Sequence, residues 1–288
     1  MVYLFLCIVF NSLLYVIFTI FKKHDINTLQ AIVVNYLVAF TLAYTQSTAS
    51  YDLLEIPSQK WFFSTVILGA LFISLFILMA KTTQYLGVSV AAISGKMSMI
   101  IPVVFGIIIY KEPISGLKIF AIVLALVAVY LTSVKGKGVV NTKLLYLPMI
   151  LFLGSGILDT LLKYVEKNYV LPNEVSVFIG TIFLNAMLIG VIVLLFKKKS
   201  KEGSFEAKNI FAGFALGVFN YYAMYFLVKS LQTIGKLDSS RVFTLNNIGI
   251  VLLSALLGFL LFQEKFSTKN KIGILFAIVS VYLLMISS

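Results

Sequence analysis

The sequence predicts an all-α integral membrane protein with ten transmembrane helices, arranged as two inverted five-helix repeats. Three observations predict this fold class. Of the 288 residues, 60% are hydrophobic and only 12% are charged, which is more apolar surface than a water-soluble domain of this length can bury. Apolar runs of about 20 residues, the length that crosses a bilayer core, recur along the chain. After five such runs the sequence repeats itself.

Ten apolar runs, joined by short loops, are expected to be the membrane helices. They are apolar on all sides, so they predict helices rather than the alternating strands of a barrel. The first run lacks a basic start and a cleavage site, and we interpret it as a retained helix, not a signal peptide. The expected spans are residues 2–21, 27–46, 60–80, 87–110, 115–134, 144–165, 174–196, 208–230, 236–262 and 270–287.

The repeat is clearest around two short acidic turns. Residues 101–131 match residues 253–283 at an offset of 152 without a gap. A second match, between residues 81–87 and 229–235, has an offset of 148. The difference implies about one extra helical turn in the ninth span.

The two matches divide the chain into two halves of five spans each. The first repeat would be residues 1–134, followed by a basic linker at 135–143 and a second repeat at 144–288. Because five is an odd number, two like-folded halves in series must cross the membrane in opposite senses. Inverted repeats of this kind commonly serve alternating access around a site near the membrane midplane.

The charged residues and the single cysteine exclude several other classes of protein. The net charge of +12 comes from short lysine clusters between the apolar runs, which indicates loops facing lipid headgroups and not a nucleic-acid surface. Cys7 lies inside the first run, so no disulfide framework or thiolate metal cluster is expected. Phosphate-binding glycine loops, Gly-x-Ser-x-Gly and histidine pairs are missing, so we expect no enzyme, no cofactor and no metal.

Two matching series of residues carry a resemblance to a known family. They are Gly87, Pro102, Gly106, Glu112 and Tyr130, and Gly235, Gly258, Glu264, Gly273 and Tyr282. With these the chain resembles the drug/metabolite transporter superfamily, in its ten-helix EamA-like branch, over nearly its whole length. Residues 249–273 also resemble the last two helices of the small multidrug resistance proteins. The resemblance implies the ten-helix fold and transport, and it does not imply a substrate. The chain departs from the family pattern at Ser254 and Lys96.

Lys96 is the strongest candidate for binding a solute. It lies well inside the fourth span, where a charge costs about 2.5–3.5 kcal/mol to insert. Pro102 removes a backbone hydrogen bond and should free a carbonyl near Ser98, which makes it a predicted hinge. A lysine beside an opened turn could bind an anionic group, and Arg241 could contribute to the same site. The alternatives are a lysine paired inside the bundle, a lysine that snorkels to the interface, and an Arg241 that reaches headgroups.

Asparagine and tyrosine residues deep in several other spans form further candidate sites. Amides cannot stay unpaired in lipid, so they are expected to face the bundle interior. Some would only join helices, but part of the two richest clusters is expected to line a solute cavity. These clusters are Asn220, Tyr221 and Tyr222 in the eighth span, and Asn246 and Asn247 in the ninth.

Two further pairs of charged residues have competing interpretations. Asp159 and Lys163 lie four residues apart in the sixth span and therefore share one helix face. They could neutralise each other, or Asp159 could couple transport to a proton or cation. Glu112 and Glu264 each end a span just before a serine that can cap the next helix. For both acids we predict a structural role at the N-terminus of that next helix.

The hypothesis from sequence is a secondary transporter, an exporter or exchanger, of a small polar metabolite such as an amino acid or another anionic organic solute. Its partners would be that solute, the lipid bilayer and a coupling proton or counter-solute. The alternatives are multidrug efflux of lipophilic cations and a non-transporting membrane scaffold or lipid-handling protein. We expect a bacterial inner membrane location. The distribution of lysines favours outside termini and the family resemblance favours cytoplasmic termini, so the orientation stays open.

Overall fold

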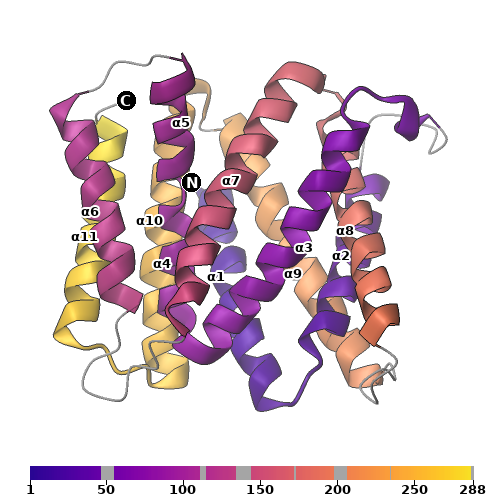
Figure 1. Ribbon diagram of the computed structural model, residues 1–288, viewed down its shortest axis with the longest axis horizontal. Coiled ribbons are helices and arrows are strands. Elements are labelled where there is room, and N and C mark those ends of the chain that lie inside the picture. Colours follow the sequence, from indigo (N-terminus) through magenta and orange to yellow (C-terminus); the bar gives the residue numbers. More distant parts are fainter. Residues whose placement is uncertain are drawn as a thin grey trace. The chain divides into compact units, whose positions relative to one another are not determined.

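The computed structural model describes residues 1–46, 55–110, 115–133, 144–171, 173–197, 206–233 and 235–286, with the side chains of 109, 110, 197, 232 and 235–241 left out. Ten segments of this described part are long and apolar enough to cross a membrane, which confirms the predicted fold class. The helices are α1 (Val2–Lys23), α2 (Thr28–Thr45), α3 (Phe62–Leu86), α4 (Val88–Met97), α5 (Ile100–Tyr110), α6 (Gly116–Ser133), α7 (Tyr146–Tyr169), α8 (Val175–Lys197), α9 (Ala207–Thr233), α10 (Gly235–Phe262) and α11 (Thr268–Ile286) (Figure 1). The predicted linker at 135–143 lies outside the described residues.

The loop predicted after residue 80 does not exist, because α3 continues to Leu86. The hydroxyl groups of Thr82 and Thr83 donate to the carbonyls of Leu78 and Met79 at 2.7 Å, so both polar groups have a partner inside the helix. Gly87 alone then separates α3 from α4. Its φ of +110° is a conformation that glycine adopts far more easily than other residues.

The fourth span consists of two helices, α4 and α5, with a turn between them at Ser98 and Met99. A proline ring clashes with the carbonyl four residues before it, which for Pro102 is the carbonyl of Ser98. That carbonyl instead accepts a tighter bond from the backbone N–H of Ile101 at 2.9 Å. The predicted break in the helix before Pro102 is therefore present, but the Ser98 carbonyl is hydrogen-bonded and not free.

The contacts group the chain into two compact units that do not follow its two halves. Unit 1 contains residues 1–20, 78–157 and 222–288, and unit 2 contains residues 21–77 and 158–221. Each unit therefore combines helices from both repeats.

In unit 1 the repeat mates α6 and α11 pack closely together in antiparallel directions (Figure 1). Ser280 Oγ on α11 donates to the carbonyl of Ala121 on α6 at 2.7 Å. A Cβ atom on Gly273 would lie 3.1 Å from the carbonyl of Ala128. Ala121 aligns with Gly273 and Ala128 with Ser280 at the offset of 152, so the two contacts are symmetry mates. The inverted orientation of the repeats is thereby confirmed.

In unit 2 the repeat mates α2 and α8 also run antiparallel. A Cβ atom on Gly190 would lie 2.6 Å from Val33 Cγ2, and one on Gly180 would lie 3.6 Å from Ala43 Cβ. The residue numbers therefore rise along one helix as they fall along the other. The second and seventh spans thus show the same inversion as the fifth and tenth.

Glycines bring a further helix against each member of this pair. A Cβ atom on Gly217 of α9 would lie 2.8 Å from the carbonyl of Asn35 on α2. One on Gly69 of α3 would lie 2.9 Å from Asn185 Cβ on α8. Gly69 and Gly217 are mates at the offset of 148. Small residues at these positions let helix backbones approach closely, which is how membrane helices associate.

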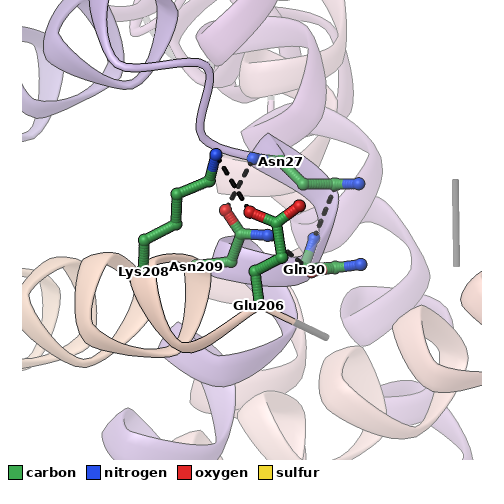
Figure 2. A network of polar contacts seen from close by, with 5 residues as sticks. All are labelled: Asn27, Gln30, Glu206, Lys208 and Asn209. Atoms are coloured by element: carbon green, nitrogen blue, oxygen red, sulfur yellow. Dashed lines mark hydrogen bonds and ion pairs between the residues drawn. The ribbon is translucent and has the colours of Figure 1, made fainter. Parts of the chain in front are cut away.

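Buried amides join the N-termini of α2 and α9 (Figure 2). Asn209 accepts from the backbone N–H of Asn27 at 2.9 Å and donates to Gln30 Oε1 at 2.7 Å. The Asn27 side chain caps α2 by accepting from the N–H of Gln30 at 3.2 Å. Beside them, exposed Lys208 pairs with Glu206 at 2.9 Å, a surface pair that contributes little to stability.

A buried carboxylate joins the N-termini of α3 and α8 at the opposite end of unit 2. Glu174 Oε2 accepts from Trp61 Nε1 at 3.2 Å and from the N–H of Leu171 at 3.0 Å. The Trp61 ring packs edge-on against Phe178. Trp61 and Asn209 are mates at the offset of 148, so each end of unit 2 has one such junction.

Candidate functional site

Lys96 lies in the last turn of α4, a helix of only ten residues, in unit 1. Its side chain is half-buried, and the preceding residue lies close to α1, since a Cβ atom on Gly95 would lie 3.4 Å from Tyr15 Oη. The C-terminal end of a helix carries partial negative charge from its unpaired carbonyls, which favours a cation at this position. The break between α4 and α5 therefore places a helix C-terminus, which favours a cation, at the position of Lys96.

Asn246 of α10 is buried and hydrogen-bonded to Cys7 of α1. Cys7 Sγ donates to Asn246 Oδ1 at 3.1 Å, and Asn11 Nδ2 donates to the carbonyl of Cys7 at 3.1 Å. The structure thus joins Asn246 of α10 to Cys7 of α1, the helix that also lies against the turn of α4 that carries Lys96. Sequence reasoning did not identify Cys7 as part of this group, because a lone cysteine in an apolar run carries no signal of its own.

Asn247 lies opposite the break in the fourth span. Its Nδ2 atom donates to Met99 Sδ at 3.2 Å. At the other end of α4, Ser89 lies beside Gly258 of α10, so α4 and α10 run antiparallel. Lys96, Asn246 and Asn247 are therefore all found along the α1, α4 and α10 elements of unit 1.

Three buried serine hydroxyls in unit 1 form no hydrogen bond to any described residue. They belong to Ser12 on α1, Ser94 on α4 and Ser254 on α10, the helices that also carry the group around Lys96. A buried polar group without a partner costs about 1–3 kcal/mol, so such groups commonly indicate a polar guest or water.

The predicted cluster in the eighth span is divided between the two units. Asn220 in unit 2 donates through Nδ2 to Asn35 Oδ1 at 3.1 Å and so joins α9 to α2. Tyr221 is buried beside it in the chain. Tyr222 in unit 1 packs in an aromatic cluster of α1 and α9, against Phe10 and Phe226. The structure therefore does not gather these three residues into one group.

The other candidate residues are not placed near Lys96 by any described contact. Asp159 and Lys163 are both exposed on α7, in unit 2. Arg241 lies in α10, with its side chain outside the described residues, and Glu112 lies outside them altogether. Among the residues that the structure describes, no three His, Cys, Asp or Glu side chains are grouped so that they could bind a metal ion.

Glu264 caps a helix, but a different one from the helix that the sequence suggested. Its carboxylate accepts from Val88 N–H, from Ser89 N–H at 3.4 Å and from Ser89 Oγ at 2.7 Å. It therefore caps the N-terminus of α4 in the other repeat, whereas a role at the N-terminus of α11 was predicted for it. Ser267 caps α11 instead, because its Oγ accepts from the N–H of Asn270 at 3.2 Å.

Ser115 plays the same part at the start of α6, where its Oγ accepts from the N–H of Lys118 at 3.2 Å. Both predicted serine caps are therefore present, and they account for the turn that each acid precedes. With its own turn already capped, the Glu264 side chain is available to a helix that is distant in sequence. The sequence around Glu264 does not reveal its partner, because Val88 lies 176 residues away.

Comparison with known protein families identifies one family for nearly the whole chain. The family described as the EamA-like transporter family matches residues 1–134 and 145–286. An uncharacterized protein of Haemophilus influenzae is 28% identical over 276 residues, which cover 93% of this chain and 92% of that protein. A protein of known crystal structure, 12% identical, superposes with a TM-score of 0.62 over 99% of this chain and 96% of its own. At that identity the likeness concerns the fold alone.

Proposed function

Because the chain belongs to the EamA-like transporter family, we propose that it is a secondary transporter of a small anionic organic solute, such as an amino acid. It would act as an exporter or exchanger in a bacterial inner membrane. The inverted repeats would provide alternating access, because each half can adopt the conformation of the other. A proton or a counter-solute would drive the cycle, and Asp159 and Lys163 remain the predicted coupling residues.

The observation that carries the proposal is the position of Lys96. A positive charge at this depth is costly, and charged residues inside membrane helices commonly mark solute or ion pathways. The turn between α4 and α5 interrupts the helix next to Lys96, and Asn247 of α10 contacts Met99 in that turn. A carboxylate or phosphate would complement the charge of the lysine.

Thermal stability of the purified protein tests this proposal. A solute that binds the folded state raises the melting temperature, so amino acids, nucleotides, sugar phosphates and cationic drugs are compared at equal concentration. We expect stabilisation by carboxylate- or phosphate-bearing solutes and not by cationic drugs. Stabilisation by quaternary ammonium compounds instead would favour efflux of lipophilic cations, and no stabilisation by any solute would favour a scaffold.

The Lys96→Ala variant links the effect to this residue. A hydrogen bond to a charged group contributes about 1.5–3 kcal/mol, so the variant should bind the stabilising anion roughly 10- to 100-fold more weakly. Lys96→Arg keeps the charge and should retain part of the affinity. Lys81→Ala, at an exposed lysine of α3, is the matched control and should bind normally. An unchanged affinity in Lys96→Ala would remove Lys96 from the site.

A further inference from the structure

The helix that carries Lys96 is interrupted at both of its ends. Gly87, with its φ of +110°, separates α4 from α3, and the turn at Ser98 and Met99 separates it from α5. Ten residues form a rod of about 15 Å, and an isolated helix of that length is not stable in water. The position of α4 therefore depends on its packing and on whatever holds its N-terminus.

The N-terminus of α4 is held by a carboxylate from the other repeat, in a slot that two glycines leave open. A Cβ atom on Gly87 would lie 2.6 Å from Glu264 Oε1, and one on Gly258 would lie 2.5 Å from Glu264 Oε2. Ser89 Oγ closes the third side by donating to Oε2 at 2.7 Å. A side chain at either glycine would displace the acid, so both positions are shaped to receive it.

We propose that Glu264 is a positioning residue for the solute site. By capping α4 it fixes the first turn of the rod whose last turn presents Lys96. The same side chain belongs to the turn between α10 and α11, so a displacement of that hairpin would move α4 and its lysine. The inference rests on the proposed role of Lys96, but the link between Glu264 and α4 can be tested without any solute.

Hydrogen–deuterium exchange of the full-length protein in lipid nanodiscs tests that link. Glu264→Ala should speed exchange at least roughly tenfold over the whole of residues 88–97, including the end around Lys96, because the short helix is no longer fixed. Gly258→Ala should also speed exchange over residues 88–97, although Glu264 is still present, because the added Cβ atom occupies the space of the Glu264 carboxylate. Glu264→Gln keeps an acceptor oxygen and should restore part of the protection.

Ser267→Ala is the matched control in the same hairpin. It removes the cap of α11 and should speed exchange at residues 268–271 only. Faster exchange confined to residues 88–90 in Glu264→Ala would mean local fraying and would overturn the positioning role, as would no change at all.

Uptake of L-glutamate into proteoliposomes tests the effect of Glu264 on transport. Glu264→Ala and Gly258→Ala should raise KM roughly tenfold with kcat changed less than about twofold. If exchange over residues 88–97 rises and KM does not, the positioning role is overturned, although the cap itself stands. If the wild type takes up no L-glutamate, the exchange result alone decides the inference, and it is the choice of an amino acid as solute that fails.

Discussion

The fourth and ninth spans are equivalent positions of the two repeats, and within unit 1 they pack against each other in antiparallel directions. The fourth span is broken into α4 and α5, whereas the ninth is the single helix α10 of 28 residues. Pro102 and Ser254 are mates at the offset of 152. The proline prevents the regular bond to the Ser98 carbonyl, and the serine leaves its own helix intact.

This difference shows how equivalent spans of two similar repeats come to differ in charge. The break gives α4 a C-terminal end inside the span, and a helix end favours a cation, which here is Lys96. The ninth span, which is the unbroken helix α10, carries the neutral amides of Asn246 and Asn247 instead. One half thus offers the charge and the other half offers hydrogen-bonding groups.

Substituting Ser254 and Pro102 by each other's residue type is expected to have the largest effect. Ser254→Pro places a proline in the interior of α10, which costs about 3 kcal/mol or more, so the midpoint of unfolding by detergent titration should fall steeply. Pro102→Ser should instead join α4 to α5, slow hydrogen exchange at residues 98–101 and weaken solute binding without loss of stability. If Pro102→Ser leaves exchange at the turn unchanged, something other than the proline breaks the fourth span.

The contact between α6 and α11 offers a second comparison, because there the mates are Ala121 and Gly273. Gly273→Ala puts a Cβ atom 2.7 Å from Thr132 Cγ2 and 3.0 Å from the Thr132 nitrogen. Overpacking of this kind costs about 1–3 kcal/mol, which equilibrium unfolding would detect. Gly116→Ala is the control, because nothing lies within 4 Å of its added Cβ, and its stability should stay within about 0.5 kcal/mol of the wild type.

The smallest expected effect concerns the two serine caps, which are true equivalents. Ser115→Ala and Ser267→Ala each remove an oxygen that accepts a backbone N–H of the following helix at 3.2 Å. Each should cost about 1 kcal/mol of unfolding free energy, and the two losses should be similar. A loss more than about twice as large in one variant would mean that its serine also stabilises something outside the turn.

The span pattern and the repeat made most of this fold predictable. Apolar runs located ten spans to within a few residues, and the repeat with an odd number of spans required inversion, which α6 with α11 and α2 with α8 confirm. The break at Ser98 followed from Pro102. The loop predicted after residue 80 was wrong, because threonine hydroxyls can find partners within a helix, so polar residues there do not require its end.

The candidate site was predictable only in part. Lys96 stood out because a charge is rare in an apolar span, and polar residues of the ninth span stood out for the same reason. The hydrogen bond of Cys7 to Asn246 and the division of Asn220 from Tyr222 between two units could not be found that way. Composition identifies a polar residue in a span, but it does not indicate which helix that residue faces.

By itself the sequence determined the membrane environment, the number of spans, their inversion and the break in the fourth span. The membrane environment and the spans follow from hydrophobicity. The inversion follows from the odd number of spans in each repeat, and the break follows from the backbone chemistry of proline. Only the tertiary structure decided that the two units mix both repeats, and that Glu264 caps α4 instead of α11. Those outcomes depend on which distant helices pack closely at the glycines. The sequence pattern marks the glycines but does not identify the helix that packs against them.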